Sequence, residues 1–177
     1  MIKYLYPDRH FQNCLEWCAG PGFIGFRLLS DEIVKSVTML DCHRPSLDAC
    51  IETWSNRPAR LSNSSMDIVH GSTVSVLEDR TFDLIVANPP NFIDSIDGLS
   101  IDIVRITRDP GMSAHTDFFL NIKKNLKPNG IILLLKGQGG TSPVDHKSVI
   151  EQGGLKINRV IIDKSCPTLY YLEVLHQ

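Results

Sequence analysis

The residues best suited to chemistry form two short clusters, each directly after a run of apolar residues. The first is a turn with glycines at 20, 22 and 25, which follows an acid at Glu16. Glycine tolerates a positive φ and lets the backbone approach a ligand closely, so such a turn suits the binding of a small molecule. The second is Asn88-Pro89-Pro90, which follows the run 82–87 and leaves its carbonyl oxygens free to accept hydrogen bonds.

The residues around the glycines narrow the kind of ligand. Glycine triplets also bind dinucleotides, but Pro21 removes one N–H from this turn, and Glu16 would repel a pyrophosphate while pairing with an ammonium group. Asp41 closes a β-rich run at 36–40, 21 residues after Gly20. An acid at the end of a second parallel strand accepts hydrogen bonds from ribose hydroxyls. These residues predict a nucleoside-like ligand that carries an ammonium group.

The pattern E-x-C-x-G-x-G-x-x-G, from Glu16 to Gly25, resembles the first motif of class I S-adenosylmethionine (SAM)-dependent methyltransferases. In that family the acid and the loop backbone hold the methionine end of SAM, and the strand-end acid, here Asp41, binds the ribose. Relatives often carry an aspartate for the adenine amine where this chain has Ser72. The cofactor-binding residues implied by the resemblance are Glu16, Cys18, Gly20, Gly22, Gly25, Asp41, Ser72 and Asn88.

Two positions in this motif carry specific expectations. Cys18 stands where the family usually has its first glycine, and because cysteine is small we expect altered φ and ψ rather than a lost site. A branched side chain at Gly22 is expected to fill the space of the ligand and abolish binding.

The second cluster resembles the N-P-P-[YFW] signature of methyltransferases that act on a nitrogen conjugated with a planar π system, such as a nucleobase amine or a glutamine amide. Such a nitrogen is a poor nucleophile until acceptors hold its hydrogens. Asn88 Oδ1 and the Pro89 carbonyl are therefore the catalytic candidates. Asn91 replaces the aromatic residue and Phe92 follows it, so stacking on the substrate comes from Phe92 or is lost. The predicted substrate-binding residues are Pro90, Asn91, Phe92, Arg105 and Arg108, the two arginines being equally compatible with a solvated loop face.

The order of the surrounding segments predicts the fold that positions both clusters. Apolar, β-rich runs alternate with amphipathic segments, as in open α/β sheets, where ligands bind beyond the carboxyl ends of the strands. The expected strands are 14–17, 36–40, 66–69, 82–87, 131–135, 156–163 and 169–175, and the expected helices are 23–29, 45–54, 116–126 and 143–152. The short connection 165–168 predicts an antiparallel final pair. We expect a Rossmann-like three-layer α/β sandwich whose seven-stranded, mostly parallel sheet has an antiparallel C-terminal hairpin strand.

Length and composition are those of one globular domain. The 177 residues predict a single methyltransferase domain over 1–177, with 1–13 as an N-terminal strap over the site and 91–112 as a long substrate-side loop. No apolar run approaches the roughly 18 residues of a membrane span, and 1–10 has no secretory signal, so we expect a cytoplasmic protein without membrane contact. Five cysteines without a C-x-x-C pair predict neither a metal site nor a disulfide framework.

The leading hypothesis is a SAM-dependent N-methyltransferase that acts on an RNA base or a protein glutamine. With 18 basic and 20 acidic residues, a broad basic surface is not expected, and a partner subunit is a candidate source of substrate recognition. Three alternatives remain. They are a methyltransferase of a small aromatic or amide metabolite, an NAD-type oxidoreductase, which Glu16, Pro21 and the N-P-P cluster disfavour, and a non-catalytic SAM-binding subunit, which Asn88 disfavours.

Overall fold

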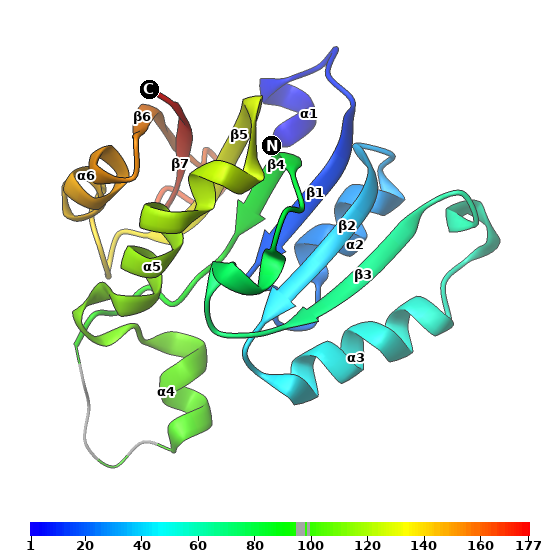
Figure 1. The fold of residues 1–177 in the computed structure, drawn as a ribbon, viewed down its shortest axis with the longest axis horizontal. Helices are drawn as coiled ribbons and strands as arrows, with labels where there is room; N and C mark the ends of the chain where they lie inside the picture. The colour runs from blue at the N-terminus through cyan, green and yellow to red at the C-terminus, as the bar shows by residue number, and fades with distance from the viewer. Residues whose placement is uncertain (95–97, 99) are drawn as a thin grey trace.

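The computed structural model describes residues 1–94, 98 and 100–177, without the side chains of residues 101, 102 and 105. Its strands are β1 (Phe11–Trp17), β2 (Val34–Asp41), β3 (Ser65–His70), β4 (Phe82–Ala87), β5 (Leu126–Gly137), β6 (Leu155–Ile162) and β7 (Leu169–His176). They form one seven-stranded sheet in the order β3-β2-β1-β4-β5-β7-β6 (Figure 1). β1 to β5 are parallel, and β7 pairs antiparallel with both β5 and β6. The predicted fold class is confirmed, including the antiparallel C-terminal hairpin.

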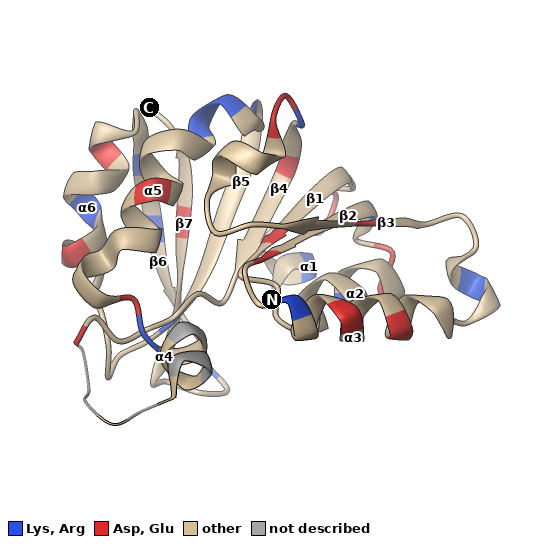
Figure 2. Cartoon of the chain, turned by 60° about the horizontal axis from the view of Figure 1, so that its bottom comes forward, with Lys and Arg blue, Asp and Glu red and all other residues tan. Residues whose placement is uncertain are grey.

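The helices cover the sheet on both faces. They are α1 (Ile2–Leu5), α2 (Phe23–Ser30), α3 (Arg44–Ser55), α4 (Ile101–Thr107), α5 (Ser113–Asn121) and α6 (Pro143–Gln152). Short 3₁₀ segments lie at Ala59–Leu61, Val74–Leu77, Pro110–Met112 and Ile122–Asn125. In Figure 2, α2 and α3 lie on one side of the sheet and α5 lies on the other. Among the described helices, none is both long and apolar enough to cross a bilayer.

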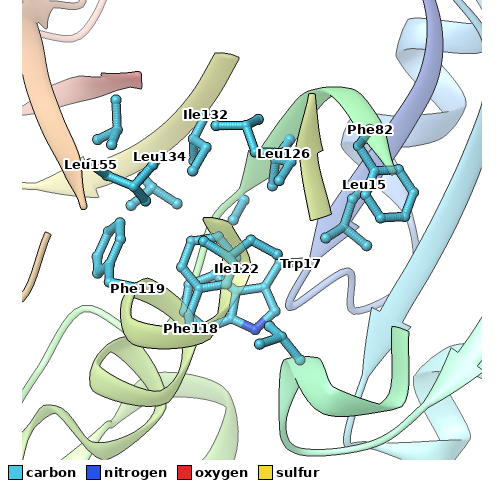
Figure 3. Close-up of a cluster of buried hydrophobic side chains, with 14 of the residues drawn as sticks. Leu15, Trp17, Phe82, Phe118, Phe119, Ile122, Leu126, Ile132, Leu134 and Leu155 are labelled. Atoms are coloured by element: carbon cyan, nitrogen blue, oxygen red, sulfur yellow. The ribbon is translucent and has the colours of Figure 1, made fainter. Parts of the chain in front are cut away.

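Two hydrophobic cores hold these layers together, one on each face of the sheet. Leu28 and Leu29 of α2 and Leu47 of α3 pack into one of them. Phe118 of α5 packs into the other, where its ring stacks on Trp17 at a centroid distance of 4.0 Å (Figure 3). A buried large aromatic pair contributes both apolar area and a stacking term, so this contact fixes α5 against the end of β1.

The structure corrects several predicted boundaries. β1 begins at Phe11, not at Cys14, because the buried Phe11 extends the sheet through an N–H bond to Ile33 O. The segment before β1 therefore covers only residues 1–10, and the Tyr6 hydroxyl donates to the buried Glu173 carboxylate of β7. β5 begins five residues earlier than the predicted 131, at Leu126, and a register shift against β4 absorbs the additional residues. The predicted loop 91–112 contains α4, with Ser100 as its N-cap.

Candidate functional site

The two clusters meet at the carboxyl ends of neighbouring strands. Trp17, the last residue of β1, pairs with Leu40 of β2 and with Ala87 of β4. The residues that follow, Cys18 and Asn88, therefore start adjacent loops. The strand order reverses between β1 and β4, and such a switch point is where open α/β sheets bind ligands.

Three residues of the glycine turn adopt a left-handed backbone conformation. The φ angles are +53° at Cys18, +54° at Gly20 and +80° at Gly22. Cys18 thus adopts a conformation that favours glycine, which costs an L-residue about 1–2 kcal/mol and keeps the shape of the turn. A Cβ at Gly20 would meet nothing within 4 Å, so this part of the turn faces open space.

Gly22 faces the protein interior, which corrects the physical reason expected for its substitution. A Cβ at Gly22 would lie 3.0 Å from Cys50 Sγ, 3.0 Å from Phe26 Cε2 and 3.1 Å from Met39 Cε. A valine would press into the core between α2 and the sheet instead of filling the ligand space. Any loss of binding in that variant would arise from displaced packing and from the strain of an L side chain at a φ of +80°.

Glu16 lies beneath the N-terminus of α2 and is 2% exposed. Its Oε2 accepts from the Gly25 N–H at 2.7 Å, and its Oε1 accepts from the Ile24 N–H at 3.3 Å. A Cβ at Gly25 would lie 2.6 Å from Oε2, so the glycine allows this contact. Burial raises the pKa of Glu16 to about 7, although the two N–H bonds oppose the shift, and the negative charge of Asp41 adds to it. A cation beside this carboxylate would stabilise its ionised form.

Asp41 and Ser72 lie at the same edge of the sheet. Asp41 Oδ2 accepts from the Gly20 N–H at 2.7 Å, and Oδ1 accepts from the His43 N–H at 2.8 Å. The Gly71 N–H donates to Asp41 O. The next residue, Ser72, is exposed and therefore lies close to Asp41. The arrangement combines two acids with an open backbone turn, a donor and acceptor set that suits a ligand with cationic and hydroxyl groups.

The second cluster presents Asn88 to solvent while Pro89 is buried. Asn91, which replaces the aromatic residue, is held to the end of β5. Its Nδ2 donates to Gly137 O at 3.0 Å, its Oδ1 accepts from the Gly137 N–H at 3.2 Å, and its main-chain oxygen accepts from the Thr141 N–H at 3.1 Å. Its side-chain amide thus anchors the N-P-P segment to β5, and a role in substrate binding stays a prediction.

Two predicted substrate-binding residues lie together. The Arg108 guanidinium is 5.2 Å from the centre of the Phe92 ring, and its Nη1 donates to Asp94 O at 3.1 Å. Phe92 remains 41% exposed. The side chain of Arg105 lies outside the described residues, so its predicted role is not placed.

A buried polar cluster beneath the N-P-P segment was not predicted from the sequence. The side chains of Asp109, His115 and Lys136 are all buried. Asp109 Oδ2 lies 2.6 Å from His115 Nδ1, and Lys136 Nζ lies 3.0 Å from His115 Nε2 and 3.1 Å from Pro90 O. Its sequence signals are a lysine ending the apolar run 131–135 and a histidine three residues before Phe118 on the inward face of α5.

The comparisons with known proteins agree with this geometry. The family model described as the methyltransferase small domain matches residues 1–138. The chain belongs to this methyltransferase family. It is a SAM-dependent methyltransferase domain, which is consistent with the acids at Glu16 and Asp41.

Individual relatives resemble this methyltransferase domain over part of their length. A bifunctional methyltransferase of Rickettsia typhi is 33% identical over 131 residues, which are 69% of this chain and 24% of the relative. A tRNA1(Val) (adenine(37)-N6)-methyltransferase of Vibrio vulnificus is 26% identical over 121 residues, 68% of this chain and 49% of the relative. The chain thus spans about a quarter of the length of the first relative and about half of the second.

The same fold occurs in solved structures of low sequence identity. The glycopeptide N-methyltransferase MtfA in complex with SAM has a TM-score of 0.69 at 15% identity, over 99% of this chain and 92% of that chain. A ribosomal protein L11 methylase from Lactobacillus delbrueckii has a TM-score of 0.65 at 14% identity, over 96% of this chain and 72% of that chain. These likenesses establish the fold.

Proposed function

We propose that this methyltransferase domain transfers a methyl group to a conjugated nitrogen, and that the nitrogen is the exocyclic N6 amine of an adenine in RNA. The observation that carries the proposal is the pairing of Trp17 with Ala87. Because these residues end β1 and β4, the glycine turn and the N-P-P segment begin side by side. Glu16, the turn from Cys18 to Gly22, and Asp41 would hold SAM. When bound, SAM would supply an electrophilic methyl group on a sulfonium, whose S–C bond breaks on transfer so that neutral S-adenosylhomocysteine is the leaving group.

The chain's own contribution is to make a poor nucleophile reactive. The lone pair of an exocyclic amine is delocalised into the ring, and it becomes available as the nitrogen turns pyramidal. Asn88 Oδ1 and the Pro89 carbonyl would accept the two amine hydrogens and favour that geometry more in the transition state than in the ground state. One of these protons leaves to solvent as the new N–C bond forms. No strong general base is required.

Two features support adenine in RNA over the other conjugated nitrogens. The Vibrio vulnificus relative is named for N6 methylation of an adenine in tRNA. In addition, Phe92 keeps 41% of its surface exposed beside the cationic Arg108, at the far end of the N-P-P segment. An exposed aromatic ring with a neighbouring arginine suits a splayed base and its phosphate.

We further propose that most RNA affinity comes from a partner subunit. In Figure 2 the lysines and arginines are scattered over several elements and interspersed with acidic residues. The net charge is −2, whereas RNA-binding surfaces concentrate positive charge on one face. The Phe92 and Arg108 pair would then orient the base after the RNA is delivered.

The test is methyl transfer from labelled SAM to unmodified tRNA transcripts, with and without a protein fraction from cells as alternative acceptor. We expect label in N6-methyladenosine after nucleoside digestion, and about a hundredfold slower labelling with the Asn88→Ala variant. Label in methylglutamine, with none in RNA, would overturn the substrate assignment and favour a protein acceptor.

A further inference from the structure

A row of three buried titratable side chains ends on the N-P-P segment, and no step proposed above uses it. We infer that Lys136, held by His115 and Asp109, is a positioning residue. By binding the Pro90 carbonyl, it aims the neighbouring Pro89 carbonyl, the proposed acceptor, at the substrate nitrogen. This inference rests on the proposed function and concerns the alignment of that site.

The hydrogen bonds of the row have a fixed direction. The Asp109 carboxylate accepts from His115 Nδ1, which leaves Nε2 as the acceptor of the ring. An ammonium group has donors only, so Lys136 Nζ donates both to His115 Nε2 and to Pro90 O. Asp109 is itself fixed, because its carboxylate also accepts from the Ala114 and His115 N–H groups at the start of α5.

The charges of the row agree with this direction. Burial lowers the pKa of His115 below its usual range, opposed by the hydrogen bond to Asp109, so the ring is neutral near pH 7. Burial tends to raise the pKa of Asp109, but the hydrogen bond from His115 and backbone N–H groups hold it well below its usual range. Burial lowers the pKa of Lys136 to about 8, opposed by the Asp109 charge, so the amine is mostly protonated at neutral pH.

The Pro90 carbonyl can fix the orientation of this segment because the two prolines leave few other backbone groups that can be held by hydrogen bonds. Pro89 and Pro90 have no N–H, and their rings restrict φ to about −65°. The main-chain orientation at this point therefore depends on ψ and on which groups hold the carbonyls. Lys136 holds the Pro90 carbonyl, and Gly137, the next residue of β5, pairs with the Asn91 side chain. Two consecutive residues of β5 thus fix the segment directly after Pro89.

A purely structural role does not account for the burial of Lys136. Its side chain is 1% exposed and ends the apolar run of β5. Burying a charged pair is often no more stabilising than apolar residues of similar volume, so stability alone gives little reason for this lysine. The donor that it places on Pro90 O is something that an apolar side chain of the same length lacks.

The primary experiment compares two lysine-to-methionine variants on the same strand. Lys136→Met removes the donor but keeps an unbranched side chain that is only one atom shorter. Lys127→Met is the matched control, because Lys127 lies at the opposite end of β5 and pairs with Asp83 at 3.2 Å. For each protein we would measure amide hydrogen exchange at Gly137 and Thr141, SAM affinity by calorimetry, and kcat and KM on tRNA transcripts.

In Lys136→Met we expect exchange at Gly137 and Thr141 to rise about tenfold or more, because these amides bond to Asn91. We expect kcat to fall about tenfold to a hundredfold, the scale of a misaligned reacting group, with little change in KM or SAM affinity. Lys127→Met should match the wild-type protein in all four measurements.

A second pair of variants keeps the inference testable if Lys136→Met does not fold. His115→Gln retains a donor toward Asp109 and an acceptor toward Lys136, whereas His115→Leu removes both. We expect the glutamine variant to keep most of the kcat and the leucine variant to lose it.

Wild-type exchange and wild-type kcat in Lys136→Met, or equal kcat in both His115 variants, would overturn the inference while leaving the proposed function intact. If the wild-type chain methylates no RNA even at transcript concentrations high enough to offset the weak affinity expected without a partner, the proposed function fails. The exchange at Gly137 and Thr141 still decides whether Lys136 fixes the segment.

Discussion

The raised pKa of Glu16 predicts that SAM binding depends on pH in a way that most acidic sites would not show. Burial raises the pKa of this carboxyl to about 7 from a usual 4.5. A folded-state pKa above the unfolded value means that the folded protein holds this proton more tightly. The contribution of Glu16 to folding stability is therefore greatest below about pH 4.5 and declines as the pH rises toward 7.

The same linkage sets the size of the effect on binding. If the ionised carboxylate binds the ammonium group of SAM, the proton must leave for binding to occur. Between pH 7.0 and 5.5, with a pKa of about 7 in the free protein and an ordinary value in the complex, SAM affinity should fall roughly fifteenfold. An α-amino group titrates near 8, so the ammonium itself stays charged over this range.

The assay is calorimetric titration of SAM at several pH values between 5.5 and 7.0, with NAD as a ligand that should not bind. Glu16→Gln is the control, and its SAM affinity should be weak and nearly independent of pH. A wild-type affinity that stays constant over this range would refute the pairing of Glu16 with the ammonium group. A variant with the same pH dependence as the wild-type protein would assign the titration to another residue.

Three further predictions concern the turn, the catalytic residue and the substrate. Cys18→Gly should raise the free energy of unfolding by about 1 kcal/mol, because glycine adopts a φ of +53° without strain; an unchanged or lower denaturation midpoint would contradict this. Asn88→Ala should leave SAM affinity nearly unchanged and lower turnover about a hundredfold, the scale of one transition-state contact, and equal turnover would remove Asn88 from the mechanism. Unrelated structured RNA should bind weakly at both low and physiological salt; nanomolar, steeply salt-dependent binding would instead indicate a self-sufficient RNA methyltransferase.

The glycine turn and the N-P-P cluster could be located from the sequence because their signals are local. Gly20 frees the backbone and Pro89 restricts it, each through its own covalent structure. A run of apolar, β-rich residues marks each strand. The short connection 165–168 likewise predicted the antiparallel pair, since four residues cannot make a parallel crossover. The edge of the sheet that carries the ligand site followed from these local features, whereas the order of the strands is given by the structure.

Only the tertiary structure brought together residues that lie far apart in the chain. Asn91 and Gly137 are 46 positions apart, and their hydrogen bonds exist because β4 and β5 are neighbours in the sheet. Lys136 reads in the sequence as the charged end of a strand, yet its side chain is buried among groups from two other segments. Local propensity cannot encode such contacts, because the burial of a polar side chain depends on which distant partners satisfy its hydrogen bonds.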